Sequence, residues 1–272
     1  MRLWYQSVTR EGSFPTYRAT LRRLLEAAAG PDVQIDVHGI RRQGGTGDQY
    51  RYLAFLETVE ILENVHRAQE EGYDAFLIGN LFDPGLREAR EIADIPVVSL
   101  GEATLQTAET MGESLGFVSI NKKFEPRLHD VLRRRRMSDM VAGVSSMQVP
   151  SMADLETAGQ DGVAVQALLA RFETAAEETV AQGAEVVIAA GGVVMAIVAD
   201  QGLFQTASGA PILNGMAALV AQAKAAVAVR QNMGGVYTSP VLTYSKPSPG
   251  EVGGFRKAYG QKVYPGVQEN EG

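Results

Sequence analysis

The sequence contains no cysteine among its 272 residues. Disulfides, thiolate metal sites and thiol catalysis are therefore excluded. Histidine is also scarce: only three are present, and each is a candidate to gain or lose a proton near neutral pH.

An excess of positive charge and a long apolar run are also missing. The net charge is −7, which argues against nucleic-acid or anionic-membrane partners. No apolar run reaches the roughly 20 residues that span a bilayer, and the N-terminus has no signal-peptide pattern, so we expect a cytoplasmic protein. The basic run 133–136 closes a helix-like stretch, where cations suit the helix dipole, and we interpret it as a solvated helix end.

Strand and helix patterns alternate along the chain. Apolar runs at 75–78, 97–100 and 115–120 are typical of buried parallel strands, and residues 33–37 alternate as in a strand. Helical spacing of apolar residues covers 55–71, and helix-like stretches cover 102–111, 124–136 and 163–182. Strands that alternate with helices predict parallel βαβ units in an α/β fold.

The sequence also contains an internal repeat. The run 72–79 is echoed by 183–190, each after a long amphipathic segment, and each is followed some twenty residues later by a proline-led strand, at 96–101 and 211–215. The matching order predicts two similar Rossmann-like domains with parallel sheets, related by a pseudo-twofold axis and enclosing a cleft. We expect one domain from residues 1–101 plus 216–272 and the other from 102–215. After residue 232 the composition shifts to Gly, Pro, Ser and Tyr, which predicts an irregular tail.

Candidate ligand-binding residues follow the predicted strands, because open parallel sheets bind ligands beyond their carboxyl ends. These positions are rich in small neutral hydrogen-bonding groups, which suit a carboxylate or an enolate oxygen. The side chains are Gln6, Ser7, Asn80, Ser119, Asn121 and Asn214, and the backbone groups belong to Gly191, Gly192 and Val193.

Two stretches of the sequence resemble hydantoin racemases, within the family of aspartate, glutamate and hydantoin racemases. They are residues 78–90, with Ile-Gly-Asn-Leu-Phe-Asp-Pro-Gly-Leu-Arg-Glu-Ala-Arg, and residues 183–195, which end in Gly-Gly-Val-Val-Met. The resemblance covers roughly residues 72–230 and implies two α/β domains around a central cleft. It also implies two thiols facing each other, which exchange a proton next to a carbonyl. Their places are held by Asn80 and Gly192, neither of which transfers a proton, so the two-thiol mechanism is excluded.

Two residues are candidates to replace the thiols as the base. His38 ends a predicted strand on the cleft side, although a histidine bonded to nearby backbone fits equally. Asp83 lies in the loop after Asn80, where Asp-Pro-Gly is also a turn and helix-start signal. The spacing of His38, Asp83 and Glu102 is not diagnostic of a metal site. The glycine loop 44–47 is expected either to close over the cleft or merely to connect two elements.

These observations predict an enzyme that acts next to the carbonyl of a small carboxylate, lactam or cyclic amide without a thiol. Lyase, decarboxylase or hydrolase chemistry is favoured, because racemisation needs acid/base groups on both faces. A one-base isomerase and a non-catalytic binder of small acids are the alternatives. We expect no cofactor, no metal, no nucleic acid or membrane partner, and a possible homo-oligomer.

Overall fold

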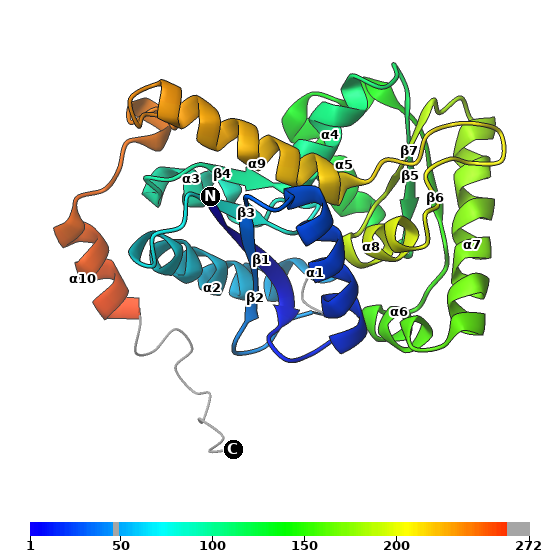
Figure 1. Cartoon of the computed structure of the whole chain (residues 1–272), viewed down its shortest axis with the longest axis horizontal. Coiled ribbons are helices and arrows are strands. Elements are labelled where there is room, and N and C mark those ends of the chain that lie inside the picture. Colours follow the sequence, from blue (N-terminus) through cyan, green and yellow to red (C-terminus); the bar gives the residue numbers. More distant parts are fainter. Residues whose placement is uncertain (46–48, 260–272) are drawn as a thin grey trace.

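The first of two parallel sheets is built almost entirely from the first 100 residues (Figure 1). The computed structural model describes residues 1–45 and 49–259. The strands are β1 (Arg2–Arg10), β2 (Gln34–Ile40), β3 (Ala75–Ile78) and β4 (Val97–Ser99), in the order β2-β1-β3-β4. All neighbouring pairs are parallel, which confirms the α/β prediction.

The second sheet repeats this arrangement with β5 (Leu115–Ser119), β6 (Val141–Ser146) and β7 (Val186–Ala189), in the order β6-β5-β7. In each sheet the first strand is central, with the second strand on one side and the third on the other. The shared order is what a duplication of one α/β unit produces, as the sequence predicts.

The prediction of a second proline-led strand at 211–215 is wrong. Only one parallel bridge, Val187 to Ile212, extends the second sheet at this position. Val187 donates its N–H to the carbonyl of Pro211, and Leu213 donates to the carbonyl of Val187. The chain then turns at once into a helix capped by Asn214, so no longer ladder forms.

Helices cover both faces of the first sheet. α2 (Arg51–Glu70) and α3 (Leu86–Ile92) pack on one face, where Ile61 and Val65 meet Trp4, Phe76 and Ile78 in a separate apolar cluster. The helices on the other face are α1 (Pro15–Ala29) and α9 (Gly215–Asn232), together with α4 (Leu100–Glu109), which packs against α9. They belong to a second, larger cluster that continues into the second sheet.

Around the second sheet lie α5 (Glu125–Arg135), α6 (Met152–Gly159), α7 (Gly162–Ala181) and α8 (Gly192–Asp200). α8 and α6 also contact α1, so they lie where the two halves of the molecule meet (Figure 1). Because one core runs through both halves, the division at residues 101/102 and 215/216 stays a prediction.

The segment after residue 232 was predicted to be irregular, but it contains two helical elements. A short 3₁₀ turn at Leu242–Tyr244 precedes α10 (Pro249–Tyr259), whose Arg256 pairs with Glu63 of α2. Residues 46–47 of the glycine loop lie outside the described residues. No helix in the described ranges is long and apolar enough to cross a membrane.

Candidate functional site

The loop after β3 is shaped by Tyr5 of β1. A Cβ built at Gly79 would lie 2.2 Å from the Tyr5 ring, so the loop can leave the strand here only as glycine. Asn80 follows, 7% exposed, and its Oδ1 accepts a 2.8 Å hydrogen bond from the backbone N–H of Phe82. This turn fixes the Asn80 side chain just beyond the carboxyl end of the sheet.

The loop after β7 becomes the amino end of α8. Gly191 precedes this helix in an extended conformation and offers no side-chain cap. The first α8 hydrogen bond runs from the Met195 N–H to the Gly191 carbonyl at 2.9 Å. The N–H groups of Gly192, Val193 and Val194 therefore have no acceptor within the helix, at its positive end. Such an end favours a carboxylate or an enolate oxygen.

These two loops meet. A Cβ built at Gly192 would lie 3.5 Å from the Gly79 carbonyl oxygen, 3.6 Å from Leu100 Cδ2 and 3.7 Å from Met216 Cε. The backbone at Gly192 therefore lies beside the residue that precedes Asn80, although more than a hundred residues separate them in the sequence.

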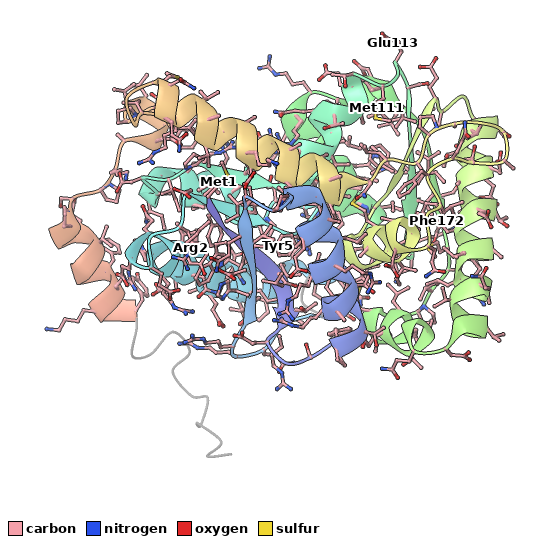
Figure 2. All side chains as sticks on the ribbon, in the orientation of Figure 1. Met1, Arg2, Tyr5, Met111, Glu113 and Phe172 are labelled. Atoms are coloured by element: carbon pink, nitrogen blue, oxygen red, sulfur yellow. The ribbon has the colours of Figure 1, made fainter. Side chains whose placement is uncertain are left out.

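Tyr5 and Met216 also lie at this contact, and sequence reasoning missed both. The Tyr5 hydroxyl lies 3.5 Å from the Gly79 carbonyl oxygen and 3.7 Å from Met216 Sδ. Tyr5, labelled beside α1 in Figure 2, is fully buried, and burial raises the pKa of its hydroxyl well above the ordinary value. It therefore stays neutral near pH 7 and is a hydrogen-bond donor, not a base.

Known proteins resemble this chain in sequence. A family model described as Asp/Glu/Hydantoin racemase matches residues 12–223. The chain belongs to this family. It is 28% identical over 241 residues to the hydantoin racemase of Pseudomonas sp. (strain NS671), covering 89% of this chain and 91% of that one. To the hydantoin racemase of Rhizobium meliloti it is 29% identical over 203 residues, covering 75% and 76%.

A solved structure agrees on the fold. Allantoin racemase from Klebsiella pneumoniae superposes with a TM-score of 0.73 at 21% identity, covering 91% of this chain and 94% of that one. The racemase-family scaffold is thus kept in a chain that has no cysteine.

Most of the predicted neutral side chains are bonded within the protein. The side-chain oxygen of Gln6 accepts hydrogen bonds from the Trp4 ring nitrogen at 3.1 Å and from the Asn64 side-chain nitrogen at 2.9 Å. The Ser7 hydroxyl lies 2.8 Å from that of Thr9, and the Ser119 hydroxyl donates to the Asn121 carbonyl at 3.3 Å.

Asn121 and Asn214 shape backbone. The Asn121 amide donates to the Val149 carbonyl at 3.1 Å, and the Asn214 Oδ1 caps α9 through the N–H groups of Met216 and Ala217. The amide nitrogens of Asn80 and Asn214 have no hydrogen-bond partner among the described residues. Of these two nitrogens, that of Asn80 lies in the loop that meets the α8 amides, and that of Asn214 lies at the start of α9.

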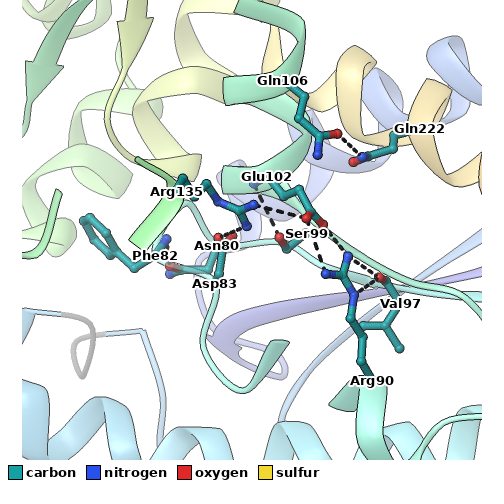
Figure 3. Close-up of polar contacts among 10 residues, drawn as sticks. All are labelled: Asn80, Phe82, Asp83, Arg90, Val97, Ser99, Glu102, Gln106, Arg135 and Gln222. Carbon is teal, nitrogen blue, oxygen red and sulfur yellow. Dashed lines mark hydrogen bonds and ion pairs between the residues drawn. The ribbon is translucent and has the colours of Figure 1, made fainter. Parts of the chain in front are cut away.

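Asp83 takes part in a chain of charges (Figure 3). Its Oδ2 lies 2.6 Å from Arg135, whose other nitrogen lies 3.1 Å from Glu102, and Glu102 pairs in turn with Arg90. The other Asp83 oxygen is buried without a hydrogen bond. Burial raises the pKa of Asp83, and the charge of Arg135 offsets only part of that effect. Asp83 is the only carboxylic acid among the predicted site residues.

Glu102 behaves in the opposite way. Burial raises its pKa, but hydrogen bonds and charge from Arg90 and Arg135 outweigh burial and hold the pKa below the ordinary value. The sequence analysis predicts no role for Arg90 in this network. It interprets Arg135, within the run 133–136, as part of a solvated helix end.

His38 lies on the α2 side of the first sheet. Its ring stacks on Trp4 with centroids 3.5 Å apart, and Nε2 lies 3.5 Å from the Tyr73 hydroxyl. Burial lowers the pKa of His38, so the ring is neutral near pH 7. Its contacts are with these aromatic residues and not with the loops at Asn80 and Gly192. In the described ranges, no three acidic or histidine side chains are grouped as a metal site requires.

Proposed function

We propose that this chain is a racemase-family enzyme that works without a thiol next to the carbonyl of a small carboxylate, lactam or cyclic amide. The observation that carries the proposal is the meeting of the Asn80 loop with the uncapped end of α8. The carbonyl oxygen would be held by the Asn80 amide and the N–H groups of Gly192 and Val193. These donors are aimed where negative charge grows as an enolate or tetrahedral oxyanion forms.

Asp83 is the base that fits this proposal better than His38. It belongs to the same loop as Asn80, and burial raises its pKa, which suits proton transfer nearer neutrality. Its Oδ1 faces Gly101 at the start of α4, and its Oδ2 pairs with Arg135. His38 is held against Trp4 by stacking. With a single base, lyase, decarboxylase or hydrolase chemistry is favoured over two-sided racemisation.

The alternative is a protein that binds a small acid and leaves it unchanged. The donors at Asn80 and α8 support this equally, because binding requires no base.

A ligand screen separates the two. Hydantoins, lactams, malonates and small carboxylates are tested for an increase in melting temperature, and each stabilising compound is then incubated with the protein and followed by NMR. A new or inverted product supports the enzyme. Stabilisation by a compound that stays chemically unchanged overturns it in favour of the binding protein.

A further inference from the structure

A cavity of about 540 Å³ lies behind the loop that carries Asn80 and Asp83. Its walls come from the start of α2, the 82–86 loop, α3, α4, α5 and the turn at Tyr244, so both halves of the molecule contribute. None of its lining residues belongs to the end of α8. The charged lining residues are Arg51, Arg87, Arg90, Arg127, Arg134 and Arg135, with Asp83, Glu88, Glu102 and Asp130.

Six arginines against four carboxyl groups give this cavity an excess of two positive charges, in a chain whose net charge is −7. Arg87 and Arg134 form no ion pair among the described residues. They remain available to a negatively charged ligand.

The deeper guanidinium groups are held in place before any ligand arrives. Arg135 is clamped between Asp83 and Glu102, and Arg90 is fixed by Glu102 and by the Val97 carbonyl (Figure 3). Their side chains are only 20% and 19% exposed. A planar guanidinium in a fixed position matches the paired oxygens of carboxylates and phosphates.

The four arginines of the basic run 133–136 have different surroundings. Arg133 pairs with Asp130, Arg134 and Arg135 line the cavity, and Arg136 ends α5 in the left-handed conformation without lining it. The interpretation of this run as a solvated helix end therefore leaves out two of its four side chains.

We propose that this cavity is a second binding site, for a small anion with two or more negative charges. Its size suits a small metabolite, and the shared chemistry of a dicarboxylate and a phosphate monoester fits its guanidinium lining. The proposal does not depend on the hydrogen-bond donors at Asn80 and α8, which lie outside the cavity lining, although Asp83 belongs to both sites.

Isothermal titration calorimetry of the full chain tests it, with succinate and inorganic phosphate as separate probes at matched chloride concentration. We expect saturable binding of one probe at one site per chain. Arg134→Gln should weaken it at least about fivefold, since a charge-assisted hydrogen bond is lost. Arg136→Gln removes the same charge two positions away and should leave the affinity within about twofold.

The probe that binds identifies the anion as carboxylate or phosphate. Gly192→Ala should not change the affinity, because Gly192 does not line this cavity and its added Cβ meets only ordinary contacts, and this separates the site from the one at α8. If Arg134→Gln lowers the melting temperature without ligand, Arg87→Gln replaces it, with the same expectation. No saturable binding of either probe, or equal weakening by Arg134→Gln and Arg136→Gln, would overturn the proposal.

Discussion

Individual side chains in the loops after β3 and β7 decide what this racemase-family scaffold does without thiols. The side-chain oxygen of Asn80 accepts the hydrogen bond of the turn, and its side-chain nitrogen has no partner among the described residues. Gly192 adds no side chain but leaves the α8 amides uncovered. The family resemblance implies a proton donor and acceptor pair at these two positions, and we propose that hydrogen-bond donors act there instead.

Asn80→Ala tests the importance of that amide. Loss of one oxyanion donor should lower kcat about 100-fold. Asn80→Asp is the matched variant: it keeps the turn-forming oxygen but replaces the donor with an acceptor, and it should lose as much. Steady-state kinetics on the compound found in the screen give both values. Full turnover by Asn80→Ala would exclude the assigned role.

Side-chain direction is what the sequence could not supply at this scale. The loops after β3 and β7 were predicted correctly, because those strand ends are visible as apolar runs that stop at glycine. The predicted strand ends at Gln6, Ser7 and His38 are wrong, because β1 continues to Arg10 and β2 to Ile40. Trp4 and Gln6 project from β1 to the opposite face from Tyr5, since successive strand residues alternate. His38 pairs in register with Gln6 and stacks on Trp4. Placing it required the strand register, which one sequence does not reveal.

At the scale of elements, continuous apolar runs located the buried strands well. The run at 75–78 coincides with β3, and the second copy at 186–189 with β7. α10 was missed because its residues are rich in glycine and proline, which have low helix propensity. The site network was missed for another reason: Arg135 reaches Asp83 across 52 residues of sequence.

That network links α3, α4 and α5, and its contribution to stability should depend on pH. The folded-state pKa of Glu102 is lowered, so its ionised form stabilises the fold above the unfolded-state pKa of about 4.3. This contribution is lost as the pH falls through the folded-state value. Glu102→Gln should therefore cost about 3 kcal/mol at pH 7, and the difference from wild type should shrink as the pH is lowered below about 4.

Urea unfolding across this pH range measures the difference. Glu88→Gln is the control, because Glu88 lines the same cavity but is exposed, and it should change stability by less than about 0.5 kcal/mol. A Glu102→Gln difference that stays constant with pH would contradict the ion-pair explanation.

At the scale of the whole molecule, two similar sheets bring the Asn80 loop and α8 together. Cysteine at both thiol positions should therefore restore the family's two-sided proton transfer. A Cβ at Gly192 meets only ordinary contacts of 3.5–3.7 Å, so the fold should tolerate Gly192→Cys. We expect Asn80→Cys/Gly192→Cys to racemise a hydantoin, measured by polarimetry, and each single variant not to. Activity of either single variant equal to that of the double would argue against two facing positions.

Deuterium exchange at the α-carbon tests the central claim most directly. A compound that stabilises the wild-type chain is incubated with it in D₂O, and the α-proton signal is followed by NMR beside Asp83→Asn and His38→Ala. The account predicts exchange or product formation by wild type and His38→Ala, and a rate at least about 100-fold lower for Asp83→Asn. No reaction with the wild-type chain, or undiminished reaction with Asp83→Asn, would contradict carbonyl-adjacent chemistry driven by this thiol-free loop.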